Sequence, residues 1–522
     1  MSDDRQTLAH VDALLARGDV GGAAVAAEAA IGAGSASLAL VFRLVVALLK
    51  QGRYREAAAR MSAAADLWPE QPAELIELGK RLMYFNQAEA LAGFARRLLQ
   101  RPVWHAAAEC DFASIVSMAG EQELARRLFD RGIASVGLDP VRRYNRSQMS
   151  LYAGRMAEAE SDLRECLRQQ PGMAKAWWAL SKLTQVQPEP ADFERMRALA
   201  ARLPANSPDE TFLRFAQFNL YDRIGRVDEA WASLEQACRS KRAQAAYDAA
   251  ATRAHLQRLI STAMPVPAKD RGAAAEGPTP IFIVGMHRSG TTLLEHVLGN
   301  HSQVAEAGEL YDFPAQLRLA IDAHFAGPSD VRVLDRLGEI DFAALGRGYV
   351  ERIRWRAGGK PFLVDKLPSN FLNIGFLRAA LPQARILHMR RSAMATCFSN
   401  LKELFSNACA YSYDQTELAD YFALYRQLMR HWQQSLPGYV LDVSYEALTA
   451  DPEAEARRVL EFCGLEWEPD CAGGRGNARA VNTASSAQVR EPIHRRSVQA
   501  WRRYEARLEP LRARLEALGE LD

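Results

Sequence analysis

The residues best suited to chemistry stand in one short segment, between an apolar run and a helical pattern. Residues 281–284 are four consecutive apolar residues, which predicts a buried strand. Leu293, Leu294, Val297 and Leu298 have helical spacing, which predicts a helix from Thr291 onward. The tight turn between strand and helix consists of Gly285, Met286, His287, Arg288, Ser289 and Gly290, and Thr291 and Thr292 begin the helix. A strand, a glycine-flanked loop and a helix N-terminus direct backbone N–H groups at one point, so the segment predicts an anion site.

The loop has the glycine spacing of the loop that binds nucleoside triphosphates, G-x-x-x-x-G-K-[ST], but Thr291 stands at the lysine position. In triphosphate-cleaving enzymes that lysine neutralises the β- and γ-phosphates, and the next hydroxyl holds magnesium. We therefore expect an anion smaller than a triphosphate, with Arg288 as an added positive charge. A magnesium-dependent kinase is the less favoured alternative, and an ordinary strand–turn–helix is the simplest one.

Further polar residues follow the first helix and three more apolar runs. These are Glu309 after the helix, Asp365, Lys366 and Asn370 after residues 362–364, Arg391 and Ser399 after residues 386–389, and Tyr445 and Glu446 after residues 439–443. A last polar segment near the C-terminus holds Ser485, Ser486, Gln488 and Arg490. Apolar runs that alternate with helical segments predict a parallel sheet, in which ligands bind beyond the carboxyl ends of the strands.

In this order, the segments from about residue 279 to 508 resemble the sulfotransferases that use 3′-phosphoadenosine-5′-phosphosulfate (PAPS). The Arg-Ser-Gly-Thr-Thr form of the loop is most similar to the protein-tyrosine sulfotransferase branch. The resemblance implies a P-loop-like α/β fold, PAPS as co-substrate, no metal, and sulfuryl transfer to a hydroxyl, with a protein tyrosine as the favoured acceptor. A carbohydrate, lipid or small phenol is the competing acceptor, and a non-catalytic nucleotide-binding scaffold is the competing class.

The resemblance also implies which residues bind the donor. They are Gly285, His287, Arg288, Ser289, Gly290, Thr291 and Thr292 in the loop, Arg391 and Ser399 at the 3′-phosphate, Tyr445 at the adenine, and Ser485 and Arg490 in a C-terminal loop. Arg391 and Ser399 have the eight-residue spacing of the family. The residues that follow Arg391 depart from the family's usual Asp or Asn with Pro or Gly, so Arg390 stays open as the phosphate ligand.

Four residues take catalytic roles by the same resemblance, namely Glu309, Lys366, Arg288 and Ser486. Glu309 would accept the proton of the acceptor, and a tyrosine hydroxyl with a pKa of ~10 needs such help. Lys366 would offset charge on the leaving phosphate. Glu306 and His301 are the competing bases, and Ser485 competes with Ser486 for the role beside the transferred group.

The first half of the chain must position this site or its substrate, and it carries a repeat. A Gly followed five residues later by an Ala recurs as Gly18/Ala23, Gly52/Ala57, Gly120/Ala125, Gly154/Ala159 and Gly225/Ala230. The first four glycines are spaced by 34 residues or twice 34, with Asn86 at the midpoint of the double interval. A 34-residue period resembles the tetratricopeptide repeat, in which such a Gly joins two antiparallel helices. We expect about five to seven helix pairs in an all-α solenoid.

These patterns divide the chain into three parts. Residues 1–263 form the predicted tetratricopeptide-like solenoid, residues 264–279 a linker rich in Pro, Gly and Ala, and residues 280–522 the sulfotransferase domain. A solenoid presents a concave face that commonly binds protein or peptide, so we expect the repeats to recruit substrate or partner.

Composition sets the remaining expectations. The chain of 522 residues is 48% hydrophobic and 25% charged, as in ordinary globular proteins, and its net charge of +2 does not favour nucleic acid. It contains no run of 18 apolar residues, so no membrane span is expected. The seven cysteines are scattered without C-x-x-C spacing, and no signal peptide is recognisable, which together favour the cytoplasm.

Overall fold

The computed structural model describes residues 2–265, 276–405, 408–472 and 498–521. The chain divides into two compact units. The first comprises Met1–Leu138, Tyr311–Ala326 and Asp335–Asp341, and the second comprises Asp139–Leu310, Gly327–Leu334 and Phe342–Asp522. Most of the predicted linker lies outside the described residues.

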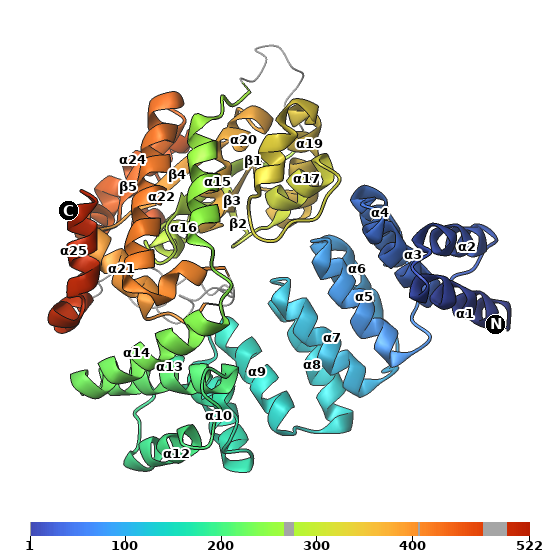
Figure 1. Ribbon diagram of the computed structural model, residues 1–522, viewed down its shortest axis with the longest axis horizontal. Coiled ribbons are helices and arrows are strands. Elements are labelled where there is room, and N and C mark those ends of the chain that lie inside the picture. Colours follow the sequence, from blue (N-terminus) through green and yellow to red (C-terminus); the bar gives the residue numbers. More distant parts are fainter. Residues whose placement is uncertain (1, 266–275, 406–407, 473–497, 522) are drawn as a thin grey trace. The chain divides into compact units, whose positions relative to one another are not determined.

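Helices follow one another without a strand through residues 2–261, all of which are described (Figure 1). They are α1 (Ser2–Ala16), α2 (Val20–Gly32), α3 (Leu38–Lys50), α4 (Tyr54–Ala64), α5 (Pro72–Tyr84), α6 (Ala88–Leu99), α7 (Ala106–Met118), α8 (Gln122–Val136), α9 (Pro140–Tyr152), α10 (Met156–Gln169), α11 (Ala174–Lys182), α12 (Pro190–Ala200), α13 (Pro208–Arg223), α14 (Val227–Gln244) and α15 (Ala249–Ser261). The prediction of an all-helical first half is confirmed, and the helices are consistent with tetratricopeptide-like pairs.

The recurring glycines and alanines lie where the repeat predicts them. The five glycines have φ values between +75° and +89°, and Asn86 at the predicted midpoint has a φ of +55°. Such positive φ values join consecutive helices and favour residues without a large side chain. The five paired alanines are fully buried, with no exposed surface, so the second helix of each pair can approach the first closely.

The first unit contains more than the repeats α1–α8. Helix α17 (Asp312–Ala320), which follows in the sequence long after the repeats, packs against α4 in this unit. The Arg55 guanidinium donates hydrogen bonds to the carbonyls of Leu319 (2.6 Å) and Ala320 (3.0 Å). The last carbonyls of a helix have no partner within it, so Arg55 satisfies the end of α17. The His324 ring stacks on Tyr84 with centroids 4.5 Å apart.

The second unit is built around a parallel sheet of five described strands in the order β2-β3-β1-β4-β5. The strands are β1 (Thr279–Gly285), β2 (Val304–Glu306), β3 (Phe362–Asp365), β4 (Arg385–Arg390) and β5 (Val440–Ser444). The fold class is therefore confirmed: an all-α first half is followed by a P-loop-like parallel-sheet domain. Four strands match the predicted apolar runs. Strand β2 was missed because three residues are too few to show a pattern.

Helices cover both faces of this sheet (Figure 1). The remaining α-helices are α16 (Thr291–Gly299), α18 (Val331–Asp335), α19 (Phe342–Arg354), α20 (Ile374–Ala380), α21 (Ala393–Leu401), α22 (Gln415–Ser435), α23 (Tyr445–Ala450), α24 (Pro452–Cys463) and α25 (Glu509–Ala517). The described 3-10 helices are η1 (Leu337–Glu339), η2 (Trp355–Ala357), η3 (Pro368–Asn373), η4 (Ala410–Tyr413), η5 (Pro469–Cys471) and η7 (Ala500–Arg507). On one face, Ile281 and Ile283 of β1 belong to a core shared with α16 and α24. On the other, Phe282 contacts Tyr349 of α19, with ring centroids 5.5 Å apart.

The later repeats α9–α15 belong to the same compact unit as the sheet. Arg242 of α14 forms a bidentate ion pair with Glu417 of α22, at 2.7 and 2.8 Å. Asp222 of α13 accepts hydrogen bonds from the Tyr504 hydroxyl (2.8 Å) and the Arg503 guanidinium (2.7 Å). Ion pairs and hydrogen bonds thus join these helices to the sheet domain.

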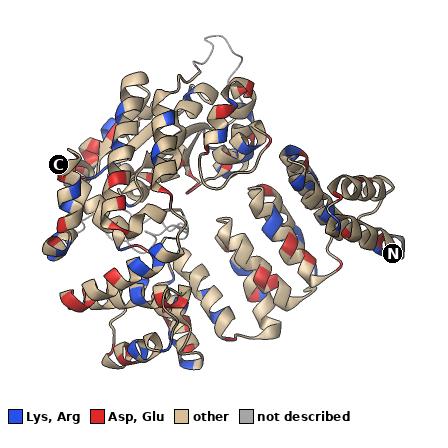
Figure 2. Ribbon diagram, in the orientation of Figure 1, with Lys and Arg blue, Asp and Glu red and all other residues tan. Residues whose placement is uncertain are grey.

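Charged residues of both signs are interspersed along the helices of both units (Figure 2). Within the described ranges, no helix combines the length and apolar character that a bilayer crossing requires.

Candidate active site

The predicted anion loop follows β1, the middle strand of the sheet. Gly290 caps the start of α16 with a φ of +107°, and Arg288 has a φ of +66°. The Asn400 amide donates to the His287 carbonyl (2.7 Å), and Arg391 donates to the Arg288 carbonyl (3.1 Å). These bonds hold the loop carbonyls. The first N–H groups of α16 have no acceptor within the helix because they lie at its start.

The two glycines that bracket the loop lie so close to neighbouring atoms that a side chain would not fit there. A Cβ at Gly285 would lie 2.6 Å from the Met389 carbonyl oxygen, and a Cβ at Gly290 would overlap the Tyr445 ring. The backbone of β4 and the Tyr445 ring therefore press against the loop from outside, and larger residues would displace it.

Buried hydroxyls line the loop. Ser289 is 1% exposed, and its Oγ has no hydrogen-bond partner among the described residues. Thr291 and Thr292 are also buried. A buried hydroxyl without a partner is costly, so Ser289 fits a site that is completed by a polar ligand. This orphaned hydroxyl and the glycine-lined loop fit the phosphate-linked end of PAPS.

The predicted 3′-phosphate residues lie together around Arg288. The Arg288 Nε donates to Ser399 Oγ (3.3 Å), and Arg391 bonds to the backbone of Arg288. The Arg391 guanidinium lies 4.6 Å above the centroid of the Tyr445 ring, the predicted adenine contact. Arg390 instead pairs with Asp442 (3.0 Å), which favours Arg391 over its neighbour.

Lys366 and Glu309 form an ion pair at the site. Lys366 is fully buried, and its Nζ lies 2.8 Å from Glu309 Oε1. A third of the Glu309 side chain is exposed, so an acceptor can reach it. Burial alone would lower the pKa of the Lys366 ammonium, but the carboxylates of Glu309 and Glu295 outweigh burial and raise it. Lys366 therefore stays charged at neutral pH.

Glu295 of α16 supports this pair from behind. Its Oε1 accepts the Gly308 N–H (2.9 Å), and its Oε2 lies 3.9 Å from Lys366 Nζ. Burial raises the pKa of Glu295, against the opposing effect of Lys366. Glu295 thus fixes both the lysine and the turn that carries Glu309.

The competing bases have other partners. The His301 ring is 1% exposed, and its two nitrogens face the Glu466 carbonyl (3.0 Å) and the Gln303 N–H (3.1 Å). Glu306 is buried on β2, with its Oε1 3.5 Å from His296 Nδ1 of α16. Neither has the exposed carboxylate edge that Glu309 offers.

His287 lies in the loop but is not a charged group there. Burial lowers its pKa to about 4, so the ring is neutral at neutral pH. Its Nδ1 lies 3.4 Å from the Tyr411 hydroxyl. Asn370 is fully buried, and its Nδ2 has no partner within the described segments.

The remaining predicted residues, Ser485, Ser486 and Arg490, lie outside the described residues. Their roles stay predictions.

The sequence did not single out Glu295, Asn400 or Glu403, although all three lie at the site. The sequence could have indicated Glu295 as a site residue, because it is the one acidic residue within the helical apolar pattern of residues 293–298. Glu403 is buried and lies 3.8 Å from the Arg288 guanidinium. The fold brings Glu403 beside Arg288, so the residues around it in the sequence could not have indicated this position.

No cluster of three or more His, Cys, Asp or Glu that could hold a metal is present in the part of the chain that the structure describes.

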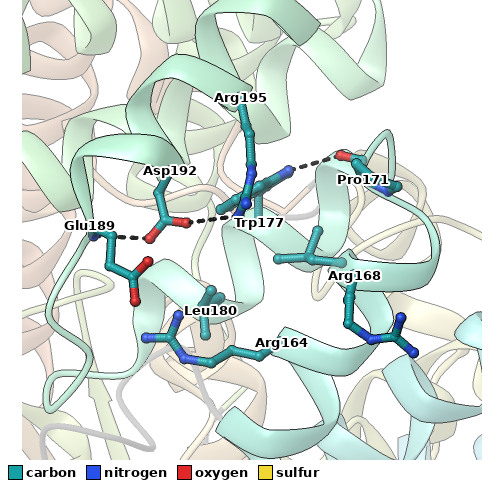
Figure 3. A pocket seen from close by; sticks show the side chains of 9 residues that line it. Arg164, Arg168, Pro171, Trp177, Leu180, Glu189, Asp192 and Arg195 are labelled. Carbon is teal, nitrogen blue, oxygen red and sulfur yellow. Dashed lines mark hydrogen bonds and ion pairs between the residues drawn. The ribbon is translucent and has the colours of Figure 1, made fainter.

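The repeats carry a hollow of their own, of about 220 Å³ (Figure 3). Trp177 is one of its lining residues and donates from Nε1 to the Pro171 carbonyl (3.0 Å). Its charged lining residues are Arg164, Arg168, Arg195, Glu189 and Asp192.

A parallel sheet with a glycine-bracketed loop after its middle strand, bordered by buried cations, is the arrangement of P-loop-like domains. Comparison with known proteins narrows the class. Residues 280–469 match the model of the sulfotransferase family. The C-terminal half of the chain thus contains a sulfotransferase-family domain, and its homologues include protein-tyrosine sulfotransferases.

Two relatives illustrate the range of similarity. An uncharacterized protein of Aquifex aeolicus (strain VF5) is 34% identical over 305 residues, which cover 57% of this chain and 40% of that protein. Protein-tyrosine sulfotransferase A of Caenorhabditis elegans is 26% identical over 239 residues, covering 42% of this chain and 60% of that protein. The matched region thus spans less than two thirds of either relative.

Among solved structures, the sulfotransferase domain from the Synechococcus PCC 7002 olefin synthase is 19% identical with a TM-score of 0.33. It covers 46% of this chain and 91% of that domain.

Proposed function

We propose that the chain is a PAPS-dependent sulfotransferase that acts on a hydroxyl acceptor, with residues 280–522 as the transferase and residues 1–263 as the recruiting repeats. PAPS would supply the sulfuryl group: its sulfur–oxygen bond to the 5′-phosphate breaks, a bond to the acceptor oxygen forms, and 3′-phosphoadenosine-5′-phosphate leaves. The observation that carries the proposal is the buried Lys366 paired with the accessible Glu309 beside a loop with an unpartnered hydroxyl.

The loop residues and the buried arginines are assigned to binding. Gly285 and Gly290 keep the loop open to a phosphate, while Ser289, Thr291 and Thr292 supply hydroxyl and N–H donors. Arg391 and Ser399 are assigned to the 3′-phosphate, with Arg288 between them and the loop. A guanidinium suits this role because it stays charged and donates two parallel hydrogen bonds to a phosphate.

Glu309 and Lys366 are assigned to the chemical step. Glu309 holds the position of a general base and would take the acceptor proton at its carboxylate. Lys366 would stabilise negative charge that grows on the leaving phosphate oxygen, and burial strengthens that interaction. In the resting site Lys366 Nζ lies 2.8 Å from Glu309 Oε1, and the neighbouring carboxylates raise the pKa of Lys366 so that it stays charged.

We assign a protein tyrosine as the acceptor, which goes further than the family does. The support is the Arg-Ser-Gly-Thr-Thr loop and the 26% identity to Protein-tyrosine sulfotransferase A. A helical repeat region with a charged hollow also suits a polypeptide partner.

The test is a transfer assay with sulfur-labelled PAPS and matched acceptors. A tyrosine peptide is compared with its phenylalanine counterpart, a small phenol and an oligosaccharide. We expect label on the tyrosine peptide alone. Label on the phenol or the oligosaccharide instead would retain the sulfotransferase and overturn the tyrosine assignment.

A further inference from the structure

A row of alternating charges runs from a repeat helix to the anion loop. Lys182, the last residue of α11, places its Nζ 2.7 and 2.9 Å from the two carboxylate oxygens of Glu403. Glu403 Oε2 lies 3.8 Å from the Arg288 guanidinium. All three residues belong to the second compact unit. Lys182 of a repeat helix therefore contacts Glu403, which in turn lies beside Arg288 of the candidate donor site.

Glu403 is an unusual neighbour for an anion site. Its side chain is 6% exposed, as is that of Arg288, so water screens their interaction poorly. Arg288 also reaches Ser399 at 3.3 Å, on the side assigned to the donor's phosphate. A bare carboxylate at Glu403 would repel that phosphate and compete with it for Arg288.

Lys182 is the partner that offsets this carboxylate. It makes the short contacts to Glu403, whereas Arg288 is more than 3.5 Å away. Lys402, the next cation in the sequence, lies over the Phe398 ring (5.3 Å) and forms no ion pair within the described residues. The cation in hydrogen-bond contact with Glu403 thus comes from the repeat helix, whereas Lys402 acts on Glu403 only from a longer range.

The end of α11 is held so that Lys182 stays in place. Arg223 of α13 donates to the carbonyls of Ser181 and Val186, each at 2.7 Å. The Asn219 amide donates to Ser181 Oγ (2.9 Å). The position of Lys182 is therefore fixed by repeat-to-repeat packing.

We propose that Lys182 is a positioning residue for donor binding: it holds and neutralises Glu403, which leaves Arg288 available to the donor's phosphate. The inference rests on the proposed function and extends it, because it makes the affinity for the donor depend on a repeat helix. Without Lys182, the Glu403 carboxylate loses its hydrogen-bonded cation. Its negative charge then attracts Arg288 and repels the bound phosphate more strongly.

The test is calorimetric titration of the full chain with 3′-phosphoadenosine-5′-phosphate. Lys182→Met should weaken binding about tenfold or more, since it leaves a buried carboxylate without its partner. Lys175→Met, on the same helix but over the Tyr144 ring (4.5 Å), is the matched control and should bind as the wild type does. Glu403→Gln should bind at least as tightly as the wild type, and in the double variant it should restore the affinity that Lys182→Met loses.

The restoration separates positioning from a general loss of structure. If Lys182→Met binds like Lys175→Met, or if the double variant stays as weak as Lys182→Met, the inference is wrong. Glu403→Gln alone gives an independent reading, because weaker binding by that variant would also overturn it. Absence of binding by the wild-type chain would overturn the proposed donor itself, and the inference with it.

Discussion

At the residue scale, the site keeps cations charged in places where burial opposes charge. Lys366 has no exposed surface, and the carboxylates of Glu309 and Glu295 compensate for the water it has lost. Removing one partner of such a group is costlier than the pair itself is stabilising, because a buried charge is left behind. Substitution of Lys366, Glu309 or Glu295 should therefore have a measurable effect.

Replacing Glu309 by Gln should separate binding from chemistry. The side chain keeps its size but loses its basicity, so we expect turnover to fall by at least ~100-fold while the bisphosphate still binds. Steady-state transfer rates and calorimetry measure the two effects. Glu306→Gln is the control, because Glu306 is the competing carboxylate. A loss of turnover in Glu306→Gln with none in Glu309→Gln would move the base to Glu306.

At the element scale, the sequence predicted what is set locally. The repeated Gly and Ala residues, the loop glycines and four strands depend on neighbouring residues, and each lies where expected. Strand β2 is too short to show a pattern, and the charge row through Lys182 and Glu403 depends on residues that are 221 apart in the sequence. Local sequence patterns cannot predict contacts between residues that are distant in the sequence.

The loop itself can be tested at Gly290. An alanine there combines an unfavourable φ of +107° with overlap on the Tyr445 ring. We expect a loss of about 1–3 kcal/mol in the free energy of unfolding and at least ~10-fold weaker bisphosphate binding. Urea unfolding and calorimetry measure these quantities.

Gly225→Ala is the control for Gly290→Ala. It has a φ of +78° in a repeat turn, and its added Cβ would meet nothing within 4 Å. It should cost stability through backbone strain but leave bisphosphate binding unchanged. Wild-type binding by Gly290→Ala would contradict the assignment of this loop as the donor cradle.

At the scale of the whole molecule, the repeats do more than precede the sheet domain. Helices α9–α15 share a compact unit with the sheet, joined by pairs such as Arg242 with Glu417. In the first unit, α4 packs against α17, and the Tyr84 ring at the end of α5 stacks on His324. The later repeats and the sheet thus share one compact unit.

The most direct test of the central claim is titration of the purified chain with 3′-phosphoadenosine-5′-phosphate, without magnesium and beside ATP. We expect the bisphosphate to bind and Arg391→Ala to weaken binding by about 10- to 100-fold, because it removes a charge-assisted contact. Arg390→Ala, whose side chain pairs with Asp442, should bind as the wild type does. No binding of the bisphosphate, or a preference for magnesium-ATP, would contradict the account.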